Sequence, residues 1–274
     1  MALIALVGAN GSPGVTVTAL AYAFTWPRPC ILAECDPAGG DIRYGYLRQL
    51  QMPDDQGIMR VVLAELRSGE GREQIWRQGG LVHLNPPQTE RLLLPGLTSP
   101  SQAPSLAPLW DQLTTMFAEL EYAEPGYDVI ADCGRLVAPY TPWPLLCRAD
   151  AVLIVARPTT ASLVSAHAAW QAARAQLRAK GTGERTLALQ LVGDGDYHPN
   201  EIARRFSDEH GRLEVLDPLP HDERAAGVLS SGGSLYRRQR LLRAATAAAV
   251  TVRQRAAAQQ ALLHPATRPE VTRA

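Results

Sequence analysis

The sequence has almost no lysine. Lys180 is the only lysine among 274 residues, so the other 26 of the 27 basic side chains are arginine. Any chemistry that needs a lysine beside a phosphate must therefore use Lys180 or another cation. The 27 basic and 27 acidic side chains give a formal charge of zero. This balance argues against a globally basic nucleic-acid binder, although a local basic patch is still compatible with it.

Long hydrophobic runs and paired cysteines are also lacking. The longest apolar stretches, such as Ala149–Ala156, are far shorter than the roughly 20 residues of a membrane-spanning helix. The apolar start, Met1–Val7, has neither a charged segment nor a small-residue cleavage site, so it does not resemble a signal peptide. These features favour a soluble, cytoplasmic protein. The cysteines show no CxxC spacing, which fits reduced thiols, and the scattered histidines predict no structural metal; the cysteines are Cys30, Cys35, Cys133 and Cys147.

Apolar runs of strand length alternate with longer helical segments along most of the chain. This alternation predicts an α/β fold with a doubly wound, mostly parallel sheet and helices on both faces. One domain is expected over residues 1–263, followed by a flexible tail over 264–274. Six prolines within residues 86–108 predict an irregular, mobile surface loop there. Strands are expected near residues 2–7, 30–34, 81–84, 127–132, 149–156, 186–192 and 214–216, and helices near 15–24, 60–66, 109–120, 160–180, 200–209 and 234–263.

A glycine-rich turn, Gly8–Gly14, separates the first expected strand from the first expected helix. Such a unit places backbone N–H groups and a helix N-terminus around an anion. The phosphate-binding pattern GxxxxGK[ST] is matched by Gly14 and Thr16, but Val15 stands at the lysine position. The alternative is a turn whose glycines only permit tight packing. The predicted nucleotide-binding residues of this segment are Gly11, Ser12, Pro13, Gly14, Val15, Thr16 and Val17.

Four later segments, in order, extend the pattern. They are Glu34–Gly39 (ECDPAG), Tyr127–Asp132 (YDVIAD), Ala149–Ala166 and Asp217–Asp222 (DPLPHD). With the glycine loop, they resemble the ParA/MinD family of deviant Walker-type ATPases, whose corresponding motifs read DxDPxG, YDxVIIDxP, ADxVLxVxxPxxxSLxxA and GxIPxD. The likeness covers nearly the whole chain. It implies the P-loop NTPase type of fold.

The resemblance also implies roles for single residues. Asp36 matches the carboxylate that positions the attacking water. Thr16 and Asp132 match the residues on the magnesium side, and a hydroxyl and a carboxylate are suitable ligands for Mg²⁺. Pro220 and Asp222 match the segment that helps to hold the adenine. ATP with Mg²⁺ is therefore the implied cofactor.

The departures from the family fall on its charged groups. The family loop reads GKGGVGKT, whereas Asn10 and Val15 occupy its two lysine positions here. Phosphoryl transfer depends on charge stabilisation, so the loss of both cations argues against tight binding and efficient hydrolysis of ATP. A strand-end asparagine near the base is replaced by Val192-Gly193, which argues against adenine recognition. Arginines that could supply the missing charge, or be ordinary surface residues, are Arg43, Arg135 and Arg157.

Two functions remain open. The first is a positioning or partitioning protein with a degenerate nucleotide site, a pseudo-ATPase that acts through protein partners. Plasmid or chromosome partition and the TadZ/CpaE type of pilus and secretion localisation both fit this description. The second is an active partition ATPase that cycles between a dimer and a monomer, binds DNA and uses an arginine in place of the lysines. A homodimer is compatible with both.

The last expected helix, from about residue 234, is rich in arginine. Six arginines and no acidic residue lie between Ser234 and Leu263. This segment could bind DNA phosphates nonspecifically, contact a protein partner, or present a solvated face. Its apolar residues are mostly alanine, so a membrane anchor is not expected. The predicted DNA or partner patch consists of Arg237, Arg238, Arg240 and Arg243.

Overall fold

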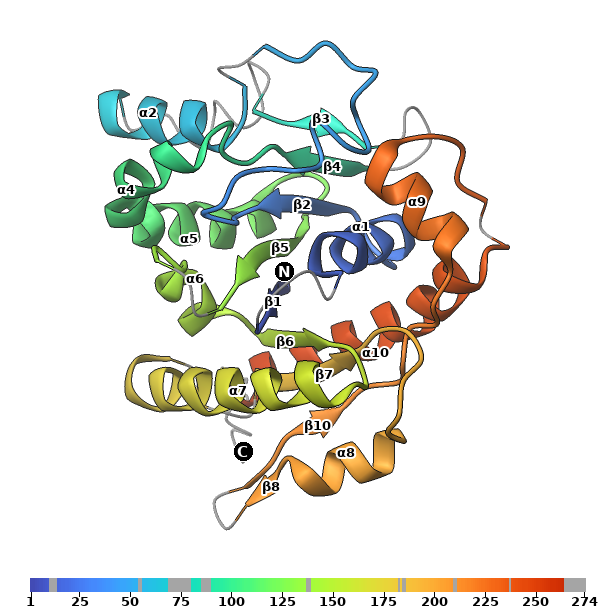
Figure 1. Ribbon diagram of the computed structural model, residues 1–274. Coiled ribbons are helices and arrows are strands. Elements are labelled where there is room, and N and C mark those ends of the chain that lie inside the picture. The colour runs from blue at the N-terminus through green and yellow to red at the C-terminus, as the bar shows by residue number, and fades with distance from the viewer. Residues whose placement is uncertain are drawn as a thin grey trace, which may run out of the picture.

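The computed structural model describes residues 1–9, 14–53, 56–68, 80–84, 90–136, 139–181, 183, 186–208, 211–236 and 238–263. Within them, a central sheet of eight strands is covered by helices on both faces (Figure 1). The α/β class and the doubly wound, mostly parallel sheet predicted from the sequence are confirmed.

The spatial order of the strands is β10-β7-β6-β1-β5-β2-β4-β3. All pairs are parallel except β3 and β4, which are antiparallel at one edge. A separate antiparallel pair is formed by β8 (Ser207–Asp208) and β9 (Gly211–Arg212). The strands of the main sheet are β1 (Leu3–Gly8), β2 (Cys30–Glu34), β3 (Val82–His83), β4 (Arg91–Leu94), β5 (Asp128–Arg135), β6 (Ala151–Ala156), β7 (Leu187–Leu191) and β10 (Glu214–Val215).

The helices divide between the two faces of the sheet. One face packs against α1, α9 and α10, and the other against α2, α4, α5, α6, α7 and α8. The helices are α1 (Val15–Thr25), α2 (Ile58–Ser68), α4 (Ala103–Leu106), α5 (Trp110–Glu119), α6 (Trp143–Arg148), α7 (Thr160–Lys180), α8 (Pro199–Arg205), α9 (Glu223–Ser231) and α10 (Arg240–Leu263), with short 3₁₀ turns at Pro100–Gln102, Ala107–Leu109 and Leu120–Tyr122.

The central strand β1 shows why the sheet needs two layers of helices. Leu3, Ala5 and Val7 belong to the core beneath α5, α6 and α7, whereas Ile4 and Leu6 belong to the core beneath α1 and α10. Successive side chains of a strand point to opposite faces. A continuous apolar strand is therefore buried on both sides, as expected for a parallel sheet.

The prediction of an irregular loop over residues 86–108 is wrong for the part that the structure describes. Arg91–Leu94 forms β4, which pairs with β2 in parallel register, and Pro100 and Pro104 lie in first turns of short helices. Proline has no backbone N–H to lose in the first helical turn, so prolines here begin helices instead of excluding them. The apolar run Leu92–Leu94 was the overlooked strand signal.

Two helix predictions also need correction. The last helix begins at Arg240 and not near Ser234, because residues 232–236 form an irregular connection with Gly232 and Gly233 at positive φ. The helix expected over 200–209 ends at Arg205. Three short helices, α4, α6 and α9, were not predicted. None of the helices in the described ranges is both long enough and apolar enough to cross a membrane.

Candidate functional site

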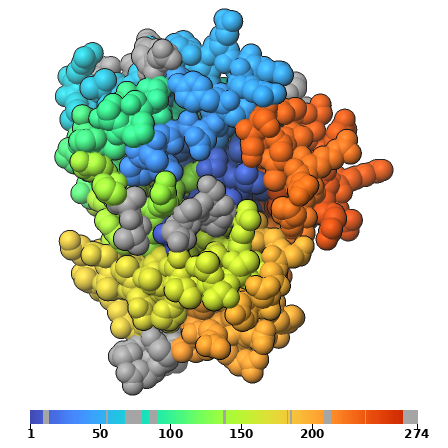
Figure 2. Space-filling view, in the orientation of Figure 1, coloured from blue at the N-terminus to red at the C-terminus, as the bar shows by residue number. Residues whose placement is uncertain are grey.

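A cavity of about 600 Å³ opens at the carboxyl ends of β2 and β5, beside the N-terminus of α1. Figure 2 shows this face hollowed between the blue N-terminal segments and the orange segment that carries α9. Ligands of open α/β sheets bind at this edge of the strands. The described residues that line the cavity are Gly14, Val15, Thr16, Val17, Leu20, Asp36, Ala38, Gly39, Asp41, Ile42, Tyr44, Gly45, Gly134, Arg135, Leu229 and Ser230.

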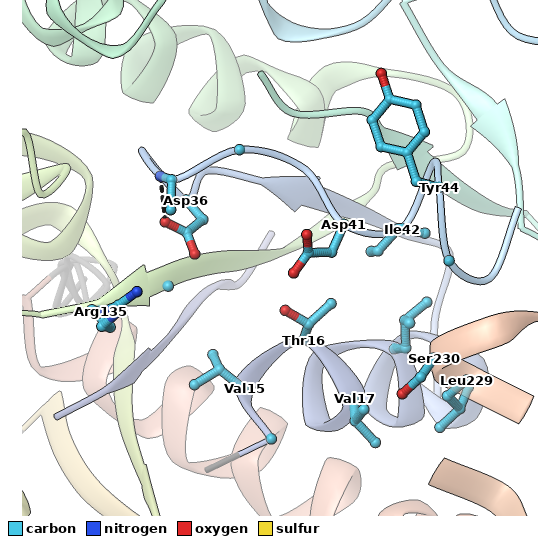
Figure 3. A pocket seen from close by; sticks show the side chains of 16 residues that line it. Val15, Thr16, Val17, Asp36, Asp41, Ile42, Tyr44, Arg135, Leu229 and Ser230 are labelled. Atoms are coloured by element: carbon cyan, nitrogen blue, oxygen red, sulfur yellow. Dashed lines mark hydrogen bonds between the residues drawn. The ribbon is translucent and has the colours of Figure 1, made fainter. Parts of the chain in front are cut away.

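The N-terminus of α1 forms one wall of the cavity. Gly14 caps the helix with a φ of 96°, a left-handed conformation that favours glycine, and its carbonyl accepts the N–H of Thr18 at 2.9 Å. Val15, Thr16 and Val17 follow on this wall (Figure 3). Three of the predicted nucleotide-binding residues, Gly11, Ser12 and Pro13, lie outside the described residues, as does Asn10 at the first lysine position.

Asp132 lies beneath Thr16, where the resemblance predicts a magnesium side. The Thr16 hydroxyl and the Gly134 N–H both donate hydrogen bonds to the Asp132 carboxylate, the latter at 3.1 Å. Burial raises the pKa of Asp132 to about 6, although these two hydrogen bonds act in the opposite direction. Asp132 is 2% exposed and is therefore a buried carboxylate.

Asp36 follows β2 on the opposite wall. Its carboxylate accepts the Ala38 N–H at 2.7 Å, which fixes the first turn of the following loop. Burial raises the pKa of Asp36; the Ala38 hydrogen bond and the charge of Arg135 lower it, and Asp41 raises it. Asp36 thus faces the cavity from the strand end at which a water-positioning carboxylate was predicted.

Asp41 is a cavity residue that the sequence analysis missed. Figure 3 shows its carboxylate pointing toward the Thr16 hydroxyl, with Asp36 beside it. The sequence signal was available, because Asp41 follows Asp36 by five residues in the same glycine-containing loop. The described walls therefore bring two carboxylates and a hydroxyl together, with Asp132 beneath.

Of the three arginines considered as replacements for lysine, one lines the cavity. Arg135, at the end of β5, lines the cavity, and its positive charge lowers the pKa of Asp36. Arg43 is buried and its guanidinium donates to the carbonyl oxygens of Pro53, at 2.6 Å, and Gln56, at 3.3 Å. Arg157 is exposed and is not among the lining residues.

Pro220 and Asp222 do not line this cavity. Asp222 is the N-cap of α9: its Oδ1 accepts the Ala225 N–H at 3.0 Å, and its Oδ2 accepts the Leu241 N–H at 3.3 Å. These backbone hydrogen bonds lower the pKa of Asp222. Leu219 pairs with Val192 beside β7, so Pro220 lies next to the Val192-Gly193 strand end.

The arginines of the last expected helix, residues 234–263, lie in two different environments. Arg238, Arg240 and Arg243 are exposed, whereas Arg237 lies outside the described residues. Arg253 and Arg255, further along α10, form ion pairs with Asp128 and Glu214, and Arg255 also donates to the Leu187 carbonyl at 2.8 Å. The hypothesis of one solvated arginine face is therefore wrong for the second half of α10.

The donor set fits a magnesium ion better than it fits free phosphates. Thr16 and Asp132 are hard oxygen donors at adjacent positions, as Mg²⁺ requires. Among the described lining residues, the cation available to a phosphate is Arg135. No group of three or more histidine, cysteine, aspartate or glutamate side chains that could hold a metal was found in the described part of the chain.

Solved structures identify the fold. A ParA family ATPase from Chlorobium tepidum matches with a TM-score of 0.68 and 17% identity, covering 91% of this chain and 97% of that one. The chain has the ParA/MinD fold. MinD from Pyrococcus horikoshii, complexed with Mg-ADP, matches with a TM-score of 0.65 and 13% identity over 94% of this chain and 98% of that one. MinD in the MinC:MinD complex of Aquifex aeolicus matches with a TM-score of 0.55 and 14% identity over 94% and 96%.

Sequence comparisons add nothing to this result, since no family model and no curated protein matches the chain. The ParA/MinD fold predicted from the motifs is confirmed by the structural matches, which cover more than nine-tenths of the chain. At identities of 13–17%, these matches establish the fold alone. Function has to be argued from the site.

Proposed function

We propose that this chain is a positioning or partitioning protein of the ParA/MinD type, with a degenerate nucleotide site, and that it acts through protein partners. The observation that carries the proposal is the charge of the cavity. Asp36 and Asp41 line it and Asp132 lies beneath, whereas Val15 stands where a lysine would reach the phosphates. Among the described residues that line the cavity, Arg135 is the one that carries a positive charge.

The physical argument is electrostatic. A nucleoside triphosphate brings several negative charges to a site that already carries carboxylates. If nucleotide binds, Thr16 and Asp132 would hold Mg²⁺, which supplies positive charge against the phosphate oxygens. Removing one preorganised electrostatic group from an active site typically costs about 10²–10³ in rate. Two absent lysines therefore favour weak or static nucleotide binding over rapid turnover.

Weak nucleotide turnover is compatible with an action through a protein partner. A protein of this fold that does not hydrolyse ATP efficiently can still present a surface to a second protein. MinD of Aquifex aeolicus has been solved in complex with MinC. By analogy of fold, we infer a cytoplasmic role in which a partner or cargo, of partition or of pilus and secretion machinery, is localised by this chain.

A second candidate function is supported by Arg135. This residue lines the cavity and its charge acts on Asp36, so it is placed to compensate for the missing lysines. The chain would then be an active partition ATPase in which Asp36 positions the attacking water. Arg43 does not support this alternative, because its guanidinium is bound to backbone carbonyls away from the cavity.

Binding of a fluorescent ATP analogue and release of phosphate, both with Mg²⁺, test the two candidates. For the degenerate site, we expect weak binding and no turnover by the wild type, and at least about tenfold tighter binding by Val15→Lys because a phosphate-facing cation is restored. Wild-type turnover that disappears in both Asp36→Ala and Arg135→Gln would overturn the pseudo-ATPase proposal and support the ATPase. Arg157→Gln, an exposed arginine outside the cavity lining, is the matched control for Arg135→Gln.

A further inference from the structure

A second cavity opens at the amino ends of β1 and β6, the opposite edge of the sheet from the cavity of the proposed function. Its volume is about 430 Å³, and it lies between α5 and α10. Small-molecule sites commonly occupy cavities of about 300–1,000 Å³. Leu3, Ala118 and Ala261 contribute apolar walls, and Arg148 and Asp150 contribute charged ones. The proposed function makes no use of this cavity.

Asp150, the residue before β6, has one carboxylate oxygen that is bound and one that is not. Oδ2 accepts the Leu3 N–H at 2.8 Å and the Gln260 Nε2–H at 2.9 Å. Oδ1 has no hydrogen-bond partner among the described residues, although Asp150 is only 8% exposed. Oδ1 is not one of the fully enclosed side-chain atoms, so it faces the cavity that Asp150 lines. A carboxylate oxygen in such a position favours a hydrogen-bond donor, and a charged donor most strongly.

The charge of Asp150 is the free negative charge of the cavity. Burial raises the pKa of Asp150 to about 6; the hydrogen bonds from Leu3 and Gln260 and the ammonium group of Met1 lower it, and Asp128 raises it. The carboxylate is therefore mostly ionised above pH 7. Glu121, the other acidic residue among the described lining residues, is paired, because the Met1 ammonium donates to its Oε1 at 2.6 Å.

Arg148 brings a positive charge to the same cavity, two residues before Asp150. Its side chain is exposed, and Nη1 donates to the Thr115 hydroxyl at 3.0 Å. Within the described part of the chain, Arg148 forms no ion pair with Asp150 or with another carboxylate. Two opposite charges thus line one cavity without neutralising each other. A ligand that carries both charges would compensate both of them at once.

We propose that this cavity binds a small aliphatic zwitterion, of the free amino acid class, with its ammonium group on Asp150 Oδ1 and its carboxylate on Arg148. An anion without an ammonium group would meet the carboxylate of Asp150, and a cation without a carboxylate would leave Arg148 uncompensated. Nε and Nη2 of Arg148 remain available to a ligand carboxylate, since the Thr115 hydrogen bond uses Nη1 alone. The apolar walls favour an aliphatic side chain over a charged one.

Isothermal titration calorimetry with L-leucine, at about pH 7.5 so that Asp150 is ionised, tests this inference. Two analogues separate the charges of the ligand: isoamylamine lacks the carboxylate, and isocaproate lacks the ammonium group. We expect saturable binding of L-leucine and at least about tenfold weaker binding of each analogue, because each leaves one charge of the cavity uncompensated. The analogues test Asp150 without a substitution that would disturb its hydrogen bonds to Leu3 and Gln260.

Two variants at exposed positions test the walls of the cavity. Arg148→Gln removes the cation and Ala118→Phe fills the space, so each should weaken the binding of L-leucine at least about tenfold. Arg157→Gln, an exposed arginine away from this cavity, is the matched control and should bind like the wild type. Failure of L-leucine to bind saturably, equal binding of either analogue, or binding that survives either variant would overturn the inference. No nucleotide is used, so these outcomes leave the proposed function unaffected.

Discussion

Gly134 and Asp36 fit together so closely that only glycine is compatible with their arrangement. Gly134 has a φ of 62°, and a Cβ built on it would lie 2.1 Å from Asp36 Cγ. Gly134 lies near the end of β5, and Asp36 follows the end of the neighbouring strand β2. The backbone of one strand end therefore makes the space that the carboxylate of the other occupies, and the position of Asp36 depends on a residue that carries no functional group.

The first prediction follows from this contact. Gly134→Ala should displace the Asp36 carboxylate and strain the backbone at a positive φ, which together should cost about 2 kcal/mol of unfolding free energy. Urea denaturation would measure the loss. Gly227→Ala is the matched control, because Gly227 is exposed within α9 and a Cβ there meets nothing within 4 Å. It should stabilise the protein by about 0.5–1 kcal/mol. Equal effects in the two variants would contradict the argument.

The second prediction separates two arginines of α10. Arg253 Nε donates to Asp128 Oδ2 at 3.1 Å, and Asp128 is fully buried. Arg253→Ala removes one of the charge-assisted hydrogen bonds of this buried carboxylate and should cost about 1–3 kcal/mol. Arg243→Ala, on the same helix but exposed, should change stability by less than about 0.5 kcal/mol. Chemical denaturation at one pH would compare them.

Asp128 keeps two further partners in Arg253→Ala, which limits the expected loss. Its Oδ1 accepts the Ala2 N–H at 2.8 Å, and its Oδ2 accepts Trp26 Nε1–H at 2.9 Å. Asp128→Ala should therefore be more damaging than Arg253→Ala, since it leaves three donors without their acceptor. The opposite order would show that the ion pair matters more than the hydrogen bonds.

The sequence predicted those parts of the fold whose signal is local. β1 and β6 are buried on both faces of the sheet, so apolar and polar residues do not alternate along them. They were recognised from the sequence as continuous apolar runs of strand length. Arg91–Leu94 was missed because prolines on both sides suggested a loop. The proline at position 104 lies in a first helical turn, where its missing N–H costs nothing. Local chemistry alone does not distinguish that position from a loop.

The candidate site was predictable to a similar extent. Asp36, Asp132 and Thr16 were found because each lies at a strand or helix end with a recognisable motif. Asp41 was not assigned a role, because its importance depends on which loop folds over which strand. That arrangement is tertiary: the Gly96 N–H reaches the Glu34 carboxylate only after β4 has paired with β2. Likewise, the pairing of Arg253 with Asp128 joins residues 125 positions apart.

The third prediction concerns pH. The pKa of Asp132 is raised by burial to about 6 in the folded protein, from an ordinary value of 3.8. A raised carboxyl pKa means that the folded state favours the protonated form, so this group's contribution to stability is lost as the pH rises from about 4 to about 6. Asp132→Asn lacks this titration. The free energy of unfolding of the variant, relative to that of the wild type, should therefore rise by on the order of 1–3 kcal/mol across that window.

Denaturation of both proteins at pH 4, 5, 6 and 7 would measure this difference. Asp217→Asn, which changes an exposed carboxylate, is the control, and its difference from the wild type should stay nearly constant. Asparagine retains a carbonyl oxygen that can accept the Thr16 and Gly134 hydrogen bonds, so the comparison isolates the charge. A constant difference for Asp132→Asn as well would show that the folded protein does not retain the raised pKa.

The last prediction concerns nucleic acid. Arg238, Arg240 and Arg243 are exposed around the start of α10, so they are available to phosphates, unlike Arg253 and Arg255. If the chain binds DNA nonspecifically, replacing these three arginines by glutamine should weaken binding and reduce the slope of log affinity against log salt by up to about 3. The control is a triple variant of Arg28, Arg204 and Arg205, which are exposed on other parts of the surface. It removes the same amount of charge and should leave the salt slope mostly unchanged. Equal losses in the two triple variants would indicate that net charge, and not this patch, attracts DNA.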